Sequence, residues 1–341
     1  MRFSDLPRWD SDDHLAAFSA FCGSAEAVVA CGGPLGAVCA RALEQRSRVS
    51  TSAEARGFFE REFTPRRIEP GGPAGLLTGY YEPVIDGSFD PTSAYAVPLY
   101  KRPPDLENVV PEAERSAQSS GYSHMRRTAT GLSPYATRED IERGALAGSG
   151  LELLYLADPV DAFFLHVQGS GAIRLPNGRM QRITYDGKNG HPYTSIGRTL
   201  IDDGSMQRDD ITLQTLTGWL HADPARARTV LWRNKSFVFF RLLDAEAPIG
   251  VLGTALHPFR SLAVDPAFHA LGAPIFVSSP AMTHMGADGF NQLMVAHDVG
   301  SAIKGPERGD IFYGTGEAAL VGAGITKHPG TFFVLVPRSA S

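Results

Sequence analysis

Two aspartates in the C-terminal part of the chain are the strongest candidates for acid–base chemistry. Asp298 follows the apolar run 293–296, and Asp310 begins the apolar segment 310–313. A carboxyl group at the end of a buried strand loses hydration, which raises its pKa and suits it to act as a general acid. The alternative is that both aspartates only cap turns, where this residue is common. The residues alone leave both interpretations open.

A second polar cluster lies in the middle of the chain. Segment Phe163–Gly171 contains Gln168 and Ser170, and segment Tyr185–Tyr193 adds amides, hydroxyls and aromatic rings on glycine-rich turns. Such groups are typical of sugar recognition, in which hydrogen bonds are combined with stacking on sugar rings. A hairpin with ordinary turn residues has the same composition, so this cluster by itself predicts no function.

Several other kinds of site lack their signatures. The chain has no Gly-x-Gly-x-x-Gly or Walker-type phosphate loop, no Gly-x-Ser-x-Gly nucleophile turn and no His-Glu-x-x-His zinc motif. Its three cysteines, Cys22, Cys31 and Cys39, lie close together near the N-terminus. A zinc site would need four ligands, so we predict no metal site. One disulfide between N-terminal helices and three buried thiols remain equal alternatives.

The composition limits the class of protein. The 341 residues are 43% hydrophobic and 20% charged, which permits one large packed domain or two. A net charge of −5 without blocks of like charge argues against a nucleic-acid partner. The high content of glycine and proline favours short strands and turns over a helical bundle. We identify no membrane span and no signal peptide.

The first elements along the chain are predicted to be helices. Apolar residues recur at helical spacing from the N-terminus to about position 65. A third helix is expected to begin at the capping box Thr51–Glu54, to bury Phe58, Phe59 and Phe63, and to end before Pro65. These helices form a packing layer and not a site.

Shorter elements follow. We predict a strand at 76–84, a polar stretch at 86–135, a helix at 137–146, a strand pair at 163–168 and 182–185, and helices at 194–201 and 210–220. Six short strands are then expected at 237–243, 249–252, 274–278, 292–296, 310–313 and 331–336. Such a series fits a small closed barrel.

Five segments together resemble one known family, the membrane-bound lytic murein transglycosylase A (MltA) family. In chain order they are Thr78–Pro83, Phe164–Gly171, Asn189–Gly197, Asn234–Phe240 and Asp298–Gly305 with Asp310. They keep the family's order and cover most of the chain from about residue 70 onward, so chance agreement is not credible.

The resemblance implies a mainly β fold with two domains. A double-psi β-barrel domain would consist of residues 1–85 and 240–341, with the N-terminal helices as one layer. A smaller β-rich substrate-binding domain would be inserted over residues 86–239, and glycan would bind in the groove between the two. The predicted late strands agree with this arrangement, because a barrel made from them needs a further strand from the Leu76 region.

The resemblance also implies an activity. Family members cleave the β-1,4 bond between N-acetylmuramic acid and N-acetylglucosamine in peptidoglycan and leave a 1,6-anhydromuramoyl end. The nucleophile is the C6 hydroxyl of the sugar itself, held close to C1 at high effective molarity. One carboxyl group therefore suffices, and the family's pattern assigns this role to Asp310. Asp298 matches a second family aspartate, which we expect to tune Asp310 or to bind sugar.

By matching motif positions, the resemblance implies five substrate-binding residues: Thr78, Tyr81, Gln168, Ser170 and Lys304. A structural ion pair is an equal alternative for Lys304. We predict that no cofactor is needed and that peptidoglycan strands are the partner of a monomeric, periplasmic protein. No lipobox cysteine precedes the helices, so attachment to the outer membrane would depend on a segment that this chain does not display.

Two alternative functions remain at this stage. A non-catalytic glycan-binding or wall-loosening protein could use the same barrel. A hydrolase would need a second carboxylate placed to activate water.

Overall fold

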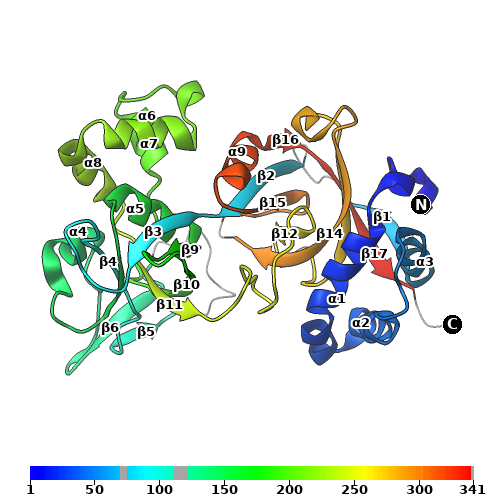
Figure 1. Ribbon diagram of the computed structural model, residues 1–341, viewed down its shortest axis with the longest axis horizontal. Helices are drawn as coiled ribbons and strands as arrows, with labels where there is room; N and C mark the ends of the chain where they lie inside the picture. The colour runs from blue at the N-terminus through cyan, green and yellow to red at the C-terminus, as the bar shows by residue number, and fades with distance from the viewer. Residues whose placement is uncertain (70–74, 111–120, 301, 339–341) are drawn as a thin grey trace. The chain divides into compact units, whose positions relative to one another are not determined.

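The computed structural model describes residues 1–69, 75–110, 121–300 and 302–338 (Figure 1). The chain divides into two compact units, and each is described here by itself. Unit 1 comprises residues 1–81 and 247–341, and unit 2 comprises residues 82–246. Both contain helices as well as strands. The fold is therefore mixed α/β, not mainly β as the sequence predicts.

The predicted N-terminal helices of unit 1 are confirmed. They are the short turns η1 (Phe3–Asp5) and η2 (Trp9–Ser11) and the helices α1 (His14–Cys31), α2 (Gly33–Gln45) and α3 (Ser52–Glu62). The capping box at the start of α3 forms as expected, with Thr51 and Glu54 each bonding the other's backbone N–H. These helices pack against the sheet of unit 1 (Figure 1).

Helix α1 bears on the prediction that no segment is a membrane span. Among the described residues it is one helix that is long and apolar enough to cross a membrane, by length and composition. Half of that stretch is buried inside the structure. Phe18 and Phe21 of α1 pack against the rings of Phe58 and Phe59 on α3. Packing in the core of unit 1 thus accounts for its apolar character.

Of the two alternatives for the cysteines, the disulfide is excluded. Cys22, Cys31 and Cys39 are all free thiols. Cys22 and Cys39 are buried, and burial raises the pKa of Cys22 to about 11 and that of Cys39 to about 12. Cys31 is exposed, so the alternative of three buried thiols holds for two of them.

The sheet of unit 1 has eight strands, whose bounds are β1 Phe63–Arg67, β2 Leu76–Glu82, β12 Ser261–Val264, β13 Pro274–Ser279, β14 Phe290–Val299, β15 Arg308–Thr315, β16 Lys327–Pro329 and β17 Thr331–Pro337. Their order in the sheet is β1-β17-β13-β14-β12-β15-β2-β16. The turn η6 (Thr283–Met285) and the helix α9 (Glu317–Ile325) complete the unit. Strands β12 and β14 run parallel, whereas β12 and β15 run antiparallel. Helix α1 packs on β14, α2 on β17 and α3 on β1.

Most of the predicted late strands are present in this sheet, with two corrections. Residues 249–252 form no strand, because the chain turns at Gly253 and only an isolated bridge joins Ile249 to Ala255. The strand at 237–243 exists but belongs to unit 2. Phe63 is buried as predicted and begins β1 directly after α3.

Unit 2 has a six-stranded sheet and a three-stranded sheet. The strands are β3 Val84–Ser88, β4 Val97–Tyr100, β5 Leu106–Asn108, β6 His124–Thr128, β7 Gly131–Ser133, β8 Glu152–Leu156, β9 Ser170–Arg174, β10 Met180–Lys188 and β11 Val238–Leu243. The larger sheet has the order β11-β10-β9-β3-β8-β4, and the smaller one has the order β5-β6-β7. The helices are α4 Arg138–Asp140 with the π-helical turn η4 Ile141–Ala145, α5 Pro159–Gln168, α6 Ile196–Asp202, α7 Leu213–His221 and α8 Pro224–Leu231, with the turn η5 Arg208–Asp210 before α7.

The predicted strand at 163–168 is wrong, because this segment is the C-terminal part of helix α5. Asp158 caps its first turn, Pro159 occupies the first position, and Gly169 ends it in the left-handed conformation. The sequence of α5 lacks the apolar–polar periodicity of a surface helix because two faces of this helix are buried. Ala162 and Leu165 face the sheet, and Phe163 packs with α6, α7 and α8.

Two of the other predicted helices are confirmed, and a third is confirmed in part. Those at 194–201 and 210–220 are confirmed as α6 and α7, whereas α8 was not predicted. The helix expected at 137–146 is only partly regular, because it loosens into η4 and breaks at Gly144, whose φ is 105°.

Candidate functional site

Asp298 and Asp310 are held at equivalent positions on either side of strand β12. Ala263 of β12 pairs with Asp298 of β14 on one edge and with Asp310 of β15 on the other. Neighbouring strands lie about 4.8 Å apart, so the two backbones are separated by about 10 Å. The sheet thus brings together the two carboxyl groups that the sequence singles out.

A β-bulge sets this register. Leu262 pairs with Ala296 and the next residue, Ala263, pairs with Asp298, so His297 is the extra residue of β14. Without it His297 would lie opposite Ala263. Bulges commonly redirect a side chain next to an active site. Here the bulge places Asp298 level with Asp310 and directs His297 into the core.

Strand β2, the neighbour of β15, contributes one hydrogen-bond donor to each aspartate. The hydroxyl Oγ1 of Thr78 donates to Oδ1 of Asp310 at 2.5 Å, and the hydroxyl of Tyr80 donates to Oδ2 of Asp298 at 3.1 Å. Side chains two residues apart on a strand project from the same face. Tyr81 therefore projects from the opposite face, where it packs against an apolar cluster.

Gly79, between the two donors, is required by close packing. A Cβ atom there would lie 2.7 Å from the Cα of Ala323 on α9 and 2.7 Å from the ring of Tyr313. Real Cβ atoms do not approach backbone atoms so closely. The glycine therefore lets β2 approach α9 closely enough to present Thr78 and Tyr80 to the aspartates.

Burial controls the charge states of the site. It raises the pKa of Asp298 from 3.8 to about 6, and the charge of Asp310 adds to this effect. It also raises the pKa of Asp310, while the hydrogen bond from Thr78 and the charge of Arg308 act in the opposite direction. The pKa of Tyr80 is raised well above 10 by burial and by both aspartates, so Tyr80 remains a protonated donor.

The two carboxyl groups differ in how their oxygens are used. Asp298 accepts from the backbone N–H of Val299 at Oδ1 and from Tyr80 at Oδ2. Asp310 accepts from Thr78 at Oδ1, and within the described residues nothing bonds its Oδ2. Asp310 thus keeps one oxygen available for proton transfer.

His297 anchors β14 immediately before Asp298. The imidazole is fully buried, with Nε2 3.0 Å from Oγ of Ser24 and Nδ1 2.8 Å from Oγ of Ser261. Ser24 donates to a backbone carbonyl of its own helix, and Ser261 accepts from a backbone N–H. Each hydrogen-bond donor among Ser24, His297 and Ser261 finds an acceptor if His297 is neutral with its proton on Nε2. Burial lowers its pKa to about 3, which keeps it neutral.

Within the described part of the chain, Lys304, Gln168 and Ser170 form no hydrogen bond or ion pair with either aspartate. The ammonium group of Lys304 is 3.7 Å from Oδ1 of Asp265, which is the geometry of the structural ion pair given as its alternative. Gln168 is the exposed last residue of α5, and Ser170 begins β9. Both belong to unit 2.

Sequence reasoning missed Tyr80, Arg308 and the role of His297. The alternation of side chains along a strand could have paired Tyr80 with Thr78. Arg308 lies two residues before Asp310 on β15 and therefore on the same face. No local pattern could have found the serines that hold His297, because Ser24 lies 273 residues away.

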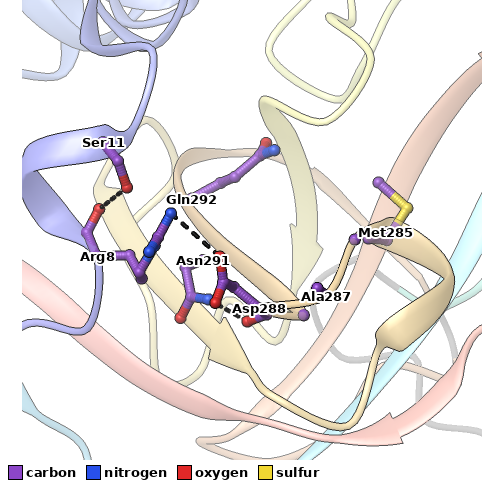
Figure 2. Close-up of a pocket in the computed structure, with 9 residues that line it drawn as sticks. Arg8, Ser11, Met285, Ala287, Asp288, Asn291 and Gln292 are labelled. Atoms are coloured by element: carbon purple, nitrogen blue, oxygen red, sulfur yellow. Dashed lines mark hydrogen bonds and ion pairs between the residues drawn. The ribbon is translucent and has the colours of Figure 1, made fainter.

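Unit 1 also contains a small cavity of about 190 Å³, which none of these residues lines. Figure 2 shows its lining, in which Arg8 forms a 3.1 Å ion pair with Asp288 and the amide of Asn291 donates to the carbonyl of Asp288. Among the described residues, no group of three or more histidine, cysteine, aspartate or glutamate side chains is placed to hold a metal ion.

Comparisons with known proteins agree with this architecture. Residues 76–241 match the model of the MltA specific insert domain, and residues 260–336 match that of the 3D domain. The membrane-bound lytic murein transglycosylase A of Vibrio cholerae is 34% identical over 266 residues, and that of Escherichia coli K12 is 33% identical over 267 residues. The matched region covers 76% of this chain and 65% of each of these relatives.

Solved structures resemble the whole chain. The membrane-bound lytic murein transglycosylase from Agrobacterium tumefaciens has a TM-score of 0.86 and 35% identity, over 99% of this chain and 97% of that one. MltA from Neisseria gonorrhoeae, in its monoclinic form, has a TM-score of 0.86 and 34% identity, over 100% and 92%. E. coli MltA with bound chitohexaose has a TM-score of 0.67 and 29% identity, over 84% and 78%. The resemblance found in the sequence is confirmed, and this chain belongs to the membrane-bound lytic murein transglycosylase A (MltA) family.

Proposed function

We propose that this protein is a peptidoglycan lytic transglycosylase in which Asp310 is the single acid and base. It would cleave the β-1,4 bond between N-acetylmuramic acid and N-acetylglucosamine and form a 1,6-anhydromuramoyl end. The family relationship supports the reaction class. The observation that carries the assignment of Asp310 is its carboxyl oxygen Oδ2, which has no partner among the described residues, whereas both oxygens of Asp298 are bonded.

The proposed step balances with one carboxyl group. The protonated carboxyl of Asp310 gives its proton to the glycosidic oxygen as the bond from that oxygen to C1 breaks. The resulting carboxylate then takes the proton of the C6 hydroxyl as its oxygen bonds to C1. A raised pKa supplies the protonated form that the first half of the step needs, and burial provides that shift for Asp310.

Asp298 would support this step without transferring a proton. With Tyr80 and Val299 bonded to it, this carboxyl group is held in a fixed orientation. Its raised pKa of about 6 keeps part of the population neutral near neutral pH, which limits repulsion of a second negative charge at the site.

For the substrate, we propose a glycan strand. The E. coli relative is named as a complex with chitohexaose, which supports binding of an extended saccharide. Thr78 would contribute from unit 1, and the exposed Gln168 and the half-buried Ser170 would contribute from unit 2. We assign Lys304 and Tyr81 weaker roles, because Lys304 pairs with Asp265 and Tyr81 packs with apolar residues.

We further propose that the unit 1 sheet is the expected double-psi barrel and that unit 2 is the inserted domain. Two strands separate β2 from β14, which is about 14 Å in a flat sheet. The bond from Tyr80 to Asp298 is consistent with a sheet that curls to bring their side chains together. A periplasmic location follows from the substrate, and the relatives are named as membrane-bound.

Mass spectrometry of the products released from purified peptidoglycan tests this function. Muropeptides lighter by one water than hydrolysis products are expected. Asp310→Asn should lose at least about 10³-fold in rate, since acid–base catalysis contributes 10²–10⁴-fold, while Asp288→Asn, which removes an exposed carboxylate of unit 1, should not. Reducing ends would identify a hydrolase, and binding without release would identify a glycan-binding protein.

A further inference from the structure

Unit 2 contains a cavity of about 620 Å³ that the proposed reaction does not use. Residues of β4, η4, α5, α7 and α8 line it, and these elements are labelled in Figure 1 except for η4. Its walls are largely apolar, with Val97, Val160, Ala227, Leu231 and Phe237 among them. A volume of this size accommodates a small organic ligand.

His166 lines this cavity and carries an unused hydrogen-bond donor. Its Nδ1 lies 3.0 Å from a terminal nitrogen of Arg138, and a guanidinium group can only donate. Nδ1 must therefore accept, and burial beside Arg138 keeps the imidazole neutral by lowering its pKa well below 6.5. The remaining proton is on Nε2. That atom is buried and has no acceptor among the described residues.

The orientation of His166 is fixed by its neighbours. Arg138 is nearly fully buried, donates to Glu142 at 3.0 Å and to the carbonyl of Ser236 at 2.9 Å, and lies against the rings of Phe163 and Phe237. A rotation of the imidazole would break its bond to this arginine. The position of the free Nε2–H is therefore fixed by the fold, in a residue that lines the cavity.

Each of two carboxylates around the cavity already has a partner at both of its oxygens. Glu142 accepts from Arg138 at one oxygen and from the indole N–H of Trp232 at the other, at 2.7 Å. Asp158 accepts from the backbone N–H of Val160 and pairs with His221 at 2.8 Å. By contrast, the guanidinium of Arg228 has no partner among the described residues. His166 and Arg228 therefore offer a ligand hydrogen-bond donors that no group in the described part of the chain uses.

We propose that this cavity binds a short peptide that carries a carboxylate. A peptide carbonyl would accept from His166, a carboxylate would pair with Arg228, and small apolar side chains would contact the walls. A saccharide fits less well, because its many hydroxyl groups would face largely apolar walls. That the ligand is the peptide attached to the glycan strands of peptidoglycan rests on the proposed function.

Calorimetric titration of the full chain with the free tetrapeptide released from peptidoglycan tests this proposal. Arg228→Gln should weaken binding about tenfold, since it removes a charge-assisted hydrogen bond. Ala227→Leu, which fills the cavity, should abolish binding. Arg179→Gln is the matched control, because Arg179 is an exposed arginine of unit 2 outside the cavity.

Two results would overturn the proposal. One is that millimolar tetrapeptide gives no heat. The other is that Ala227→Leu weakens the binding of chitohexaose but not the binding of the tetrapeptide. The measurement is independent of turnover. Asp310→Asn should bind the peptide normally, so failed peptide binding alongside normal anhydro-product formation would reject this proposal and leave the proposed function intact.

Discussion

Thr78 and Tyr80 lie on one face of β2, and each donates a hydrogen bond to a different aspartate. The pair gives Asp310 and Asp298 separate donors from one rigid strand. Because a carboxylate accepts such a bond better than a neutral carboxyl group does, each donor opposes the rise in pKa that burial causes. Each donor therefore acts directly on the charge state of its own aspartate.

Tyr80→Phe should raise the pKa of Asp298 above its value of about 6, because the mutation removes one hydrogen bond to the ionised form. NMR titration of ¹³C-labelled aspartate carboxyl groups measures this. Thr78→Val is the matched control and should raise the pKa of Asp310 instead. An unchanged Asp298 titration in Tyr80→Phe would show that the bond does not set its charge.

Asp298→Asn should become more stable relative to the wild type as pH rises from 4 to 6. The folded wild type binds the proton of Asp298 more tightly than the unfolded chain does, so it loses stability over that interval. A shift from 3.8 to about 6 corresponds to about 3 kcal/mol at most. Urea unfolding at pH 4 and pH 8 measures the difference. Equal effects at both pH values would contradict the prediction, and Asp288→Asn should show no such trend.

His297→Gln should have the opposite dependence on pH. The folded pKa of about 3 lies below the ordinary 6.5, so the stability that neutral His297 contributes is present above pH 6.5 and is lost as pH falls toward 3. The variant should be less stable than the wild type at pH 7 by roughly 1–3 kcal/mol, because its hydrogen bonds are poorer. This deficit should shrink toward pH 4 in urea unfolding, and a constant deficit would refute the neutral assignment.

Gly79→Ala should reduce both stability and activity. The new methyl group meets the backbone of Ala323, and overpacking of this kind costs roughly 1–3 kcal/mol. Displacement of β2 would also move Thr78 and Tyr80 from the aspartates. Gly324→Ala on α9 is the control, since open space surrounds that position and alanine favours a helix by about 0.5–1 kcal/mol. Thermal unfolding and product assays should separate the two variants, and equal behaviour would refute the packing argument.

Local signals predicted those parts of the fold that depend on neighbouring residues. The Thr51–Glu54 capping box located the start of α3, and the apolar run before Asp298 located half of β14. Helix α5 was mistaken for a strand because tertiary packing buries it on two sides and removes the periodicity that marks a surface helix. Its signals were Asp158, Pro159 and Gly169, the cap residues at its ends.

The sequence indicates which residue types form the site, but it does not indicate which residue each of them bonds. The family motif supplied Thr78, and the structure places it against Asp310. The same motif supplied Tyr81, yet the structure places Tyr80 beside Asp298, since the direction of a side chain depends on strand register. The pairing of Lys304 with Asp265 joins positions that are distant in the sequence and has no local signature.

The bulge in β14 makes the site sensitive to chain length. Because side chains alternate along a strand, the one surplus residue reverses which of the following residues point inward. Inserting a single residue before the bulge would bring His297 level with Asp310 and turn Asp298 toward the interior. A conservative exchange of side chains leaves that order intact. For this protein, insertions before the bulge of β14 are thus a more severe class of genetic change than substitutions.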